Sequence, residues 1–233
     1  MLLVNLSLLF ASTLAFNAST RPPNPPPSKD EQLKVPVFDH LFVKVFKWFP
    51  PIVASVPCIA ATAVGLASKL PSPTSSQILS VLLPAGHLPD LTPDRYLIAS
   101  AVLTVTASLG RIWCFRVLGR YFTYNLGIQK DHRLVTSGPY SFVRHPSYTA
   151  ALLGLTGISL THVSPSSFAR SCGWLDTPVG RFLAGLWFLH YLWGLSVVFT
   201  RLNREDTMLK KGFGDEWEQY AAKVPNRLIP WIY

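Results

Sequence analysis

Long apolar runs alternate with shorter polar stretches along this chain. The runs lie at Leu2–Phe16, Ile52–Leu70, Tyr96–Leu118, Tyr148–Val163 and Phe182–Thr200. A helix that crosses a bilayer needs roughly 20 predominantly apolar residues, with a range of about 17–25. The second, third and fifth runs reach that length, whereas the first and fourth are short unless their flanks extend them. The pattern predicts an all-α, polytopic integral membrane protein with about five transmembrane helices.

The composition agrees with a membrane protein. Of the 233 residues, 49% are hydrophobic and 14% are charged, and the mean hydropathy is +0.28. Soluble domains carry about 25% charged residues, so this chain is poor in charge. Prolines separate several of the apolar runs, and the proline-rich stretch at residues 22–27 is expected to be a short extended connector.

The distribution of basic residues predicts the orientation of the helices. Most lysines and arginines lie between residues 21 and 47, between 116 and 144, and after residue 200. The positive-inside rule places these three regions in the cytosol, which requires an odd number of spans. The first run ends in small residues, so a cleaved signal peptide is an alternative. Because no basic segment precedes that run, we expect a retained helix.

Several common kinds of site lack their sequence signatures. The net charge of +9 is not gathered in one patch, so nucleic acid is not an expected partner. The cysteines Cys58, Cys114 and Cys172 have neither the spacing of a disulfide framework nor that of a metal site. The chain has no strand-linked GxGxxG, P-loop, GxSxG, HExxH or CxxC motif. These observations exclude the common nucleotide and hydrolase frameworks, and no metal is expected.

A first polar cluster extends from His132 to Tyr148 and reads HRLVTSGPYSFVRHPSY. It gathers histidines, arginines and tyrosines directly before an apolar run. Pro146 fits the first turn of a helix, and the free amides at a helix N-terminus favour an anionic group. The alternative is an interfacial belt in which Arg144 reaches lipid phosphates.

A second polar cluster follows the last apolar run and includes Arg201, Glu205 and Asp206. If the helix continues, Arg201 and Glu205 are four residues apart and share one face. The alternative is an ordinary surface ion pair, which contributes under about 1 kcal/mol. Acidic residues near both clusters are scarce, so the composition favours a reaction that depends on positioning and charge complementarity rather than on paired carboxylates.

Together the two clusters resemble the isoprenylcysteine carboxyl methyltransferase family, the membrane enzymes that methylate prenylated C-terminal cysteines. The stretch HRLVTSGPYSFVRHPSY is similar to the cofactor motif of that family. The residues between Arg201 and Pro225 are similar to its C-terminal signature in order and spacing, although Asp206 stands where a second glutamate is frequent. The resemblance covers residues 122–230. It implies transmembrane helices and loops at residues 1–121 and a methyltransferase core at residues 122–233.

The resemblance also implies S-adenosylmethionine as the cofactor, in a cytosolic helical site near the C-terminus. Its residues would be Gln129, His132, Arg133, Leu134, Val135, Tyr140, His145, Pro146, Ser147, Tyr148 and Glu205. Asn125 is the alternative to Gln129 for the polar position before His132. Arg201 is implied as the catalytic residue and as the group that binds the substrate carboxylate.

The implied reaction suits these residues. A free α-carboxylate has a pKa of about 3.3–3.7, so at neutral pH it is a nucleophile without a general base. An arginine can hold such a carboxylate through two parallel hydrogen bonds. The implied partners are prenylated protein C-termini and the lipid bilayer. The implied location is the endoplasmic reticulum membrane, as a multi-pass protein with a cytosolic C-terminus.

Other functions remain open at this point. Sterol reductases share an ending like Gly212–Tyr233, but they use NADPH and are much longer. A phospholipid N-methyltransferase would be closer in mechanism, although an amine substrate gives no role to Arg201. A non-catalytic membrane scaffold is a third alternative.

Overall fold

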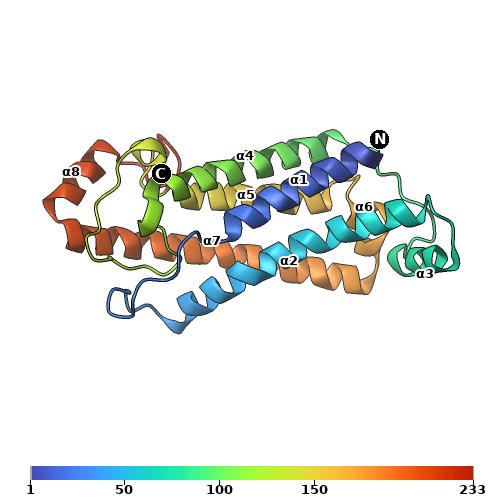
Figure 1. Ribbon diagram of the computed structural model, residues 1–233, viewed down its shortest axis with the longest axis horizontal. Helices are drawn as coiled ribbons and strands as arrows, with labels where there is room; N and C mark the ends of the chain where they lie inside the picture. The colour runs from blue at the N-terminus through green and yellow to red at the C-terminus, as the bar shows by residue number, and fades with distance from the viewer. Residues whose placement is uncertain (1, 233) are drawn as a thin grey trace. The chain divides into compact units, whose positions relative to one another are not determined.

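The computed structural model describes residues 2–232, with the backbone alone for residue 38, and its regular structure is helical. Figure 1 shows the helices, coloured in chain order. Within residues 2–232 the chain also forms three short 3-10 turns. Their bounds are α1 Leu2–Thr20, α2 Val37–Ala67, α3 Pro73–Leu82, α4 Arg95–Leu118, η1 Gly119–Tyr121, η2 Gly138–Ser141, α5 Pro146–Val163, α6 Phe168–Ser171, η3 Trp174–Asp176, α7 Pro178–Phe213 and α8 Asp215–Lys223. The predicted all-α class is confirmed.

Each predicted apolar run coincides with a helix, although the second run continues three residues past the end of α2. Helices α2 and α7 extend furthest beyond their runs. Helix α2 begins at Val37 and continues through three prolines, Pro50, Pro51 and Pro57. Membrane helices tolerate prolines in their interior. Close to the proline pair, the hydroxyl of Ser55 donates to the carbonyl of Pro51 at 2.7 Å. Helix α7 continues past Thr200 to Phe213, so the second polar cluster is helical and the condition for a shared face of Arg201 and Glu205 is met.

Among the described residues, four helical stretches are long and apolar enough to cross a membrane. They are Leu2–Thr20, Asp39–Ala67, Arg95–Tyr121 and Pro178–Phe213. The chain is therefore a multi-pass, all-α membrane protein. Helix α5 corresponds to the fourth predicted run but does not belong to this set, so the predicted number of about five spans stays a prediction.

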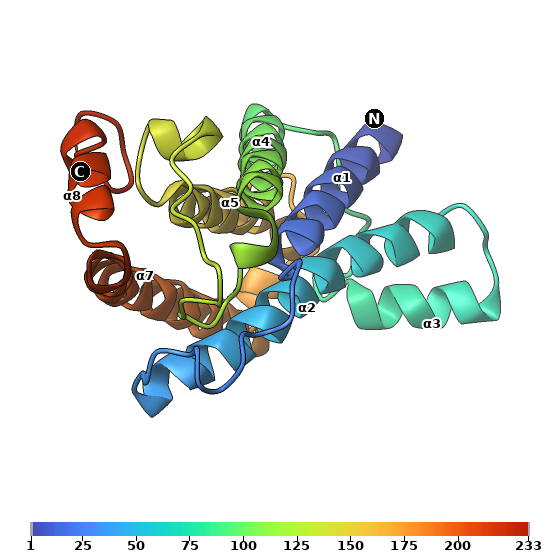
Figure 2. The same cartoon turned by 60° about the vertical axis from the view of Figure 1, so that its left-hand side comes forward.

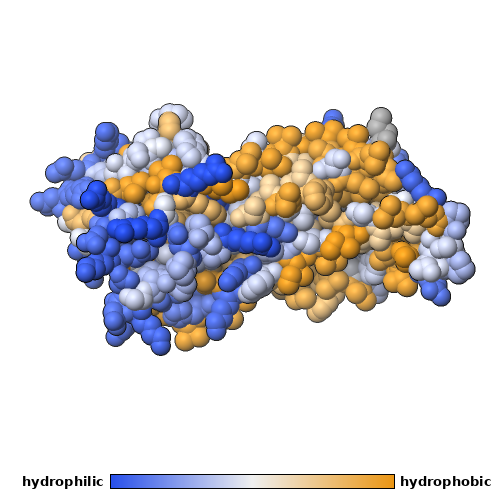
Figure 3. Space-filling model, in the orientation of Figure 1, coloured by the Kyte–Doolittle hydropathy of each residue, from blue (hydrophilic) through white to orange (hydrophobic). Residues whose placement is uncertain are grey.

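The chain forms two compact units, and α1, α2, α4, α5 and α7 contribute residues to both. The first unit comprises residues 2–17, 49–106 and 153–191. Its core includes Leu9, Val64, Leu97 and Phe168. Apolar side chains also cover its surface over α1 and α2 (Figure 3), as expected for residues that face lipid.

Small and hydroxyl-bearing residues pack the helices of the first unit. A side chain at Gly157 would place its Cβ 2.5 Å from the hydroxyl oxygen of Thr104, so the glycine permits the close approach of α5 to α4. Nearby, the hydroxyl of Thr161 donates to that of Ser100 at 3.0 Å. Membrane helices commonly associate in this way because lipid supplies no hydrophobic drive for helix pairing.

The second unit comprises residues 18–48, 107–152 and 192–232 and contains both polar clusters. Val198, Leu202 and Leu228 form a core against which Tyr148 packs. Helix α8 lies beside the segment that contains η2 (Figure 2). The hydroxyl of Tyr220 in α8 donates to the carbonyl of Tyr140 in η2 at 2.8 Å. The predicted division into residues 1–121 and residues 122–233 concerns function rather than compactness, and it stays a prediction.

Candidate functional site

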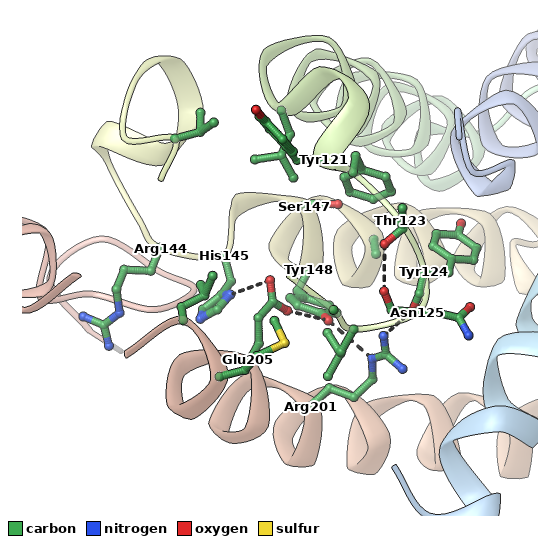
Figure 4. A pocket seen from close by; sticks show the side chains of 18 of the residues that line it. Tyr121, Thr123, Tyr124, Asn125, Arg144, His145, Ser147, Tyr148, Arg201 and Glu205 are labelled. Carbon is green, nitrogen blue, oxygen red and sulfur yellow. Dashed lines mark hydrogen bonds and ion pairs between the residues drawn. The ribbon is translucent and has the colours of Figure 1, made fainter. Parts of the chain in front are cut away.

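The second unit contains a cavity of about 140 Å³, which Figure 4 shows from close by. It lies between the end of α4, the loop that follows η1, the start of α5 and the second half of α7. Its lining includes Arg111, Tyr121, Tyr124, Asn125, His132, Leu134, Val135, Tyr140, Arg144, His145, Ser147, Tyr148, Arg201, Glu205 and Met208. Both polar clusters, which are 50 or more residues apart in sequence, therefore meet at one cavity.

Arg201 and Glu205 are joined through a tyrosine in this cavity (Figure 4). The Nε of Arg201 donates to the hydroxyl of Tyr148 at 3.3 Å, and that hydroxyl donates to Oε2 of Glu205 at 2.9 Å. A second guanidinium nitrogen of Arg201 donates to the backbone carbonyl of Tyr124. Arg201 is 5% exposed, so these contacts hold its charged group in a defined orientation inside the protein.

Asp206 has a different environment from its neighbour Glu205. Its carboxylate contacts three potentially cationic groups: Nε2 of His145 at 2.9 Å, Nε of Arg227 at 3.1 Å and Nη2 of Arg144 at 3.4 Å. Removing one partner of such a buried group leaves uncompensated charge. The Nδ1 of the same His145 lies 3.9 Å from Oε1 of Glu205. Asp206 therefore anchors the histidine, while Glu205 keeps its side chain at the cavity.

Arg144 ties the start of α5 to the C-terminal segment. Its Nη1 donates to the carbonyls of Val224 at 2.9 Å and Pro225 at 2.8 Å. Its backbone amide donates to the carbonyl of Asn226 at 2.9 Å. The guanidinium lies 5.9 Å from the ring centre of Trp217 in α8. Arg144 thus closes this side of the cavity with internal contacts, which disfavours the interfacial-belt alternative for this residue.

His132 lies in an aromatic stack. Its ring is parallel to that of Tyr121, with centroids 4.3 Å apart, and Phe213 meets it edge-on at 5.5 Å. Burial and, secondly, the positive charge of Arg120 lower the pKa of His132 from its ordinary value. Its Nδ1 is buried and has no hydrogen-bond partner among the described residues. Since buried polar atoms are normally satisfied, this nitrogen is available to a ligand.

Most of the predicted site residues line the cavity. These are His132, Leu134, Val135, Tyr140, His145, Ser147, Tyr148, Arg201 and Glu205. Gln129, Arg133 and Pro146 do not line it. Gln129 donates to the carbonyl of Arg120 at 3.1 Å, and Pro146 begins α5, as its position in the sequence indicates. Asn125, the alternative to Gln129, does line the cavity.

Sequence reasoning missed one charged group at this cavity. Arg111 is 6% exposed, and its guanidinium lies 5.5–5.9 Å from the ring centres of Phe46, Phe115 and Tyr124. Its Nη2 donates to the hydroxyl of Tyr124 at 3.1 Å, whereas its Nε is buried without a partner among the described residues. The signal was present in the sequence, because an arginine inside a transmembrane run is a functional candidate by default.

The arrangement suits an anionic ligand beside a cationic one. Arg111 and Arg201 bring positive charge to the cavity, and Glu205 brings a carboxylate. Tyr140 and Tyr148 add aromatic faces that can receive a cation. Burial strengthens all of these electrostatic interactions, because the effective dielectric constant is lower than in water.

Comparison with known proteins shows a family resemblance for the part of the chain that contains the first polar cluster. Residues 100–169 match the model of the isoprenylcysteine carboxyl methyltransferase (ICMT) family. The chain is 35% identical over 103 residues to a protein-S-isoprenylcysteine O-methyltransferase of Schizosaccharomyces pombe, which covers 43% of this chain and 36% of that protein. It is 30% identical over 116 residues to protein-S-isoprenylcysteine O-methyltransferase B of Arabidopsis thaliana, which covers 49% of each chain.

A third relative belongs to another class. The chain is 30% identical over 100 residues to a delta(14)-sterol reductase of Methylotuvimicrobium alcaliphilum, a match that covers 43% of this chain and 19% of that protein. The chain thus spans about half or less of the length of the three relatives named here. The family match at residues 100–169 includes the whole first polar cluster and α5. The resemblance of this chain to the isoprenylcysteine carboxyl methyltransferase family is confirmed.

Proposed function

We propose that this protein transfers a methyl group from S-adenosylmethionine to the C-terminal carboxylate of a prenylated cysteine. The observation that carries the proposal is the linked set of Arg201, Tyr148 and Glu205 in one cavity. The family match and the names of the two methyltransferase relatives support the same reaction. Arg201 is the catalytic residue in this proposal, because it touches the reacting carboxylate.

The cavity offers partners for each part of S-adenosylmethionine. Glu205 can pair with the ammonium group, and the stack of His132 on Tyr121 offers a flat surface and an unpaired nitrogen to the adenine. The faces of Tyr140 and Tyr148 can receive the sulfonium, an interaction that contributes about 0.5–2 kcal/mol. The predicted residues Leu134, Val135 and Ser147 complete the binding surface. The predicted residues that do not line the cavity would support that surface from outside it; these are Gln129, Arg133 and Pro146.

The proposed chemistry needs orientation rather than proton transfer. When bound, S-adenosylmethionine supplies a methyl group on a positively charged sulfur. The substrate carboxylate is already ionised at neutral pH, so one of its oxygens can form the new C–O bond while the C–S bond breaks. Arg201 holds the carboxylate through two N–H groups, which fixes the direction of attack. Arg111 adds a second positive charge to the cavity, and both arginines donate hydrogen bonds to Tyr124.

The location follows from the substrate. A prenyl chain partitions into the bilayer, and each buried CH₂ group contributes about 0.8 kcal/mol. The protein is a multi-pass membrane protein, so a lipid-embedded substrate can reach it from the membrane. We place the site on the cytosolic side of the endoplasmic reticulum membrane, with the C-terminus cytosolic, from the distribution of basic residues. In this proposal residues 122–233 form the methyltransferase core.

The test is methyl transfer by the full chain in nanodiscs. Labelled S-adenosylmethionine and N-acetyl-S-farnesylcysteine are the substrates, and the Arg201→Ala variant is assayed in parallel. The proposal expects a base-labile methyl ester with the wild type and none with the variant. Sterol reduction that depends on NADPH, without methyl transfer, would instead establish the reductase function. Transfer of a base-stable methyl group to a lipid amine would establish the phospholipid alternative.

A further inference from the structure

The connector between α1 and α2 is bonded to the wall of the cavity. Two residues of its segment 28–33, which we call the N-terminal clamp, pair with the loop that follows η1. The backbone amide of Leu33 donates to the carbonyl of Leu126 at 2.8 Å, and Gln32 forms an isolated antiparallel bridge with Gly127. The segment that follows the expected extended connector at residues 22–27 therefore pairs with a loop about 95 residues further along the chain.

Side chains reinforce this backbone pairing. The Nδ2 of Asn125 donates to Oε1 of Gln32 at 3.1 Å, and the backbone amide of Lys130 donates to Oε1 of Glu31 at 2.6 Å. The other carboxylate oxygen of Glu31 accepts from the hydroxyl of Ser28 at 2.8 Å. These bonds, that of Lys130 foremost, lower the pKa of Glu31 from its ordinary value. The clamp therefore holds both ends of loop 125–130.

The same connector also holds the start of this loop region. The Nδ2 of Asn24 donates to the carbonyls of Gly119 at 2.8 Å and Phe122 at 2.9 Å. Gly127 allows the closest contact, since a Cβ at that position would lie 2.5 Å from the carbonyl oxygen of Glu31. A glycine is needed there because the two backbones touch, and any side chain would separate them.

The clamped loop borders the cavity at its carboxylate-binding end. Tyr124, Asn125 and Gly127 line the cavity, and the carbonyl of Tyr124 accepts a hydrogen bond from Arg201. A second cavity of about 10 Å³ is lined by Gln32, Asn125 and Arg201 together. The clamp thus contacts the loop, and the loop contacts the guanidinium of Arg201, which the proposed reaction uses.

We propose that the N-terminal clamp is a positioning element for Arg201. It fixes loop 125–130, the loop fixes the carbonyl of Tyr124, and that carbonyl fixes one side of the guanidinium. Without the clamp the guanidinium gains rotamer freedom, and substrate binding must then offset the entropy of ordering it. The inference rests on the proposed function, because Arg201 is assigned there to the substrate carboxylate. It predicts a selective effect on the prenylcysteine substrate rather than on the cofactor.

The test compares two glycine variants of the full chain in nanodiscs. Gly127→Ala forces the clamp from the loop, whereas Gly110→Ala adds the same methyl group where nothing lies within 4 Å. We expect Gly127→Ala to raise the KM for N-acetyl-S-farnesylcysteine about fivefold or more, with the KM for S-adenosylmethionine changed less than about twofold. Trypsin should also cleave Gly127→Ala faster at the exposed Lys29 and Lys34. The Gly110→Ala variant should match the wild type in all three measurements.

A second pair of variants tests the clamp without added bulk, so that the inference remains testable if Gly127→Ala fails to fold. Glu31→Ala removes the acceptor for the Lys130 amide without adding bulk, and Glu31→Gln restores an acceptor oxygen. The inference expects a raised KM for the prenylcysteine in Glu31→Ala and recovery in Glu31→Gln. Equal losses for both substrates, or no change in Gly127→Ala, would overturn it. A wild type without methyl transfer would refute the proposed function, whereas an unchanged trypsin rate in Gly127→Ala would refute the clamp, so the two failures are distinguishable.

Discussion

The hydroxyl group of Tyr148 lies 2.9 Å from a carboxylate oxygen of Glu205 and donates a hydrogen bond to it. Tyr148 stands in the first turn of α5, and Glu205 stands near the end of α7. The same hydroxyl accepts a hydrogen bond from Arg201. One neutral group therefore connects the residue proposed for the substrate with the residue proposed for the cofactor.

Replacing Tyr148 by phenylalanine tests this connection. The ring remains, but Arg201 and Glu205 each lose a partner in a buried setting. Hydrogen bonds to charged groups contribute about 1.5–3 kcal/mol, so we expect kcat/KM to fall about tenfold to a hundredfold. Initial rates with each substrate varied in turn measure the effect. A kcat/KM within twofold of the wild type would mean that the connection has no role in the reaction.

Arg201→Lys tests the proposed carboxylate contact. Lysine keeps the charge but cannot form two parallel hydrogen bonds with a carboxylate. We expect the KM for N-acetyl-S-farnesylcysteine to rise about tenfold, with nearly unchanged affinity for S-adenosylmethionine. Kinetics and direct cofactor binding to the same preparation separate the two effects. Equal losses for substrate and cofactor would contradict the assigned role.

Glu205→Ala tests the cofactor side of the cavity. Its carboxylate is partly exposed to the cavity and pairs with the cofactor ammonium in our proposal. We expect the dissociation constant of S-adenosylmethionine to rise about tenfold, since one charged contact is lost. Calorimetric titration of the variant and the wild type would measure it, and an unchanged dissociation constant would remove Glu205 from the cofactor site.

Asp206→Asn should act on stability rather than on the reaction directly. The amide would leave His145, Arg144 and Arg227 without the negative charge that now faces all three. Breaking a buried ion pair costs about 3–5 kcal/mol. We expect a clear drop in the unfolding temperature in detergent, with Asp90→Asn on an exposed loop as the control. A variant as stable as this control would show that Arg144, His145 and Arg227 need no buried carboxylate between them.

The pH dependence of stability tests the environment of His132. Its pKa is lowered in the folded protein, so the unfolded chain binds a proton more readily as the pH falls through about 6.5. The contribution of this residue to stability is therefore lost on acidification. Between pH 8 and pH 5.5 we expect the unfolding temperature of the wild type to fall further than that of His132→Phe. This variant retains a ring beside Tyr121. Equal losses would show that His132 titrates normally.

The sequence alone determined the membrane class, the helices and the two clusters. Apolar runs of membrane length dictate helices, because every backbone polar group in lipid must be satisfied within its own segment. Pro146 marked the start of α5 correctly, since a proline at that position loses no hydrogen bond. The spacing of Arg201 and Glu205 placed both on one helical face. The family resemblance also rested on local motifs, which are readable in order along the chain.

Only the tertiary structure decided which groups meet. Arg201 contacts the Tyr124 carbonyl 77 residues away, and Arg204 pairs with buried Asp39, 165 residues away. The sequence treated Asp206 as a near-equivalent of a glutamate, but packing surrounds it with Arg144, Arg227 and His145. The N-terminal clamp was likewise invisible in the sequence. Arg111 stood out as an arginine inside an apolar run, but only the structure shows that it lines the same cavity as Arg201. Such contacts depend on the path of loops and on close backbone approaches, as at Gly127, and no local pattern of apolar and polar residues encodes them.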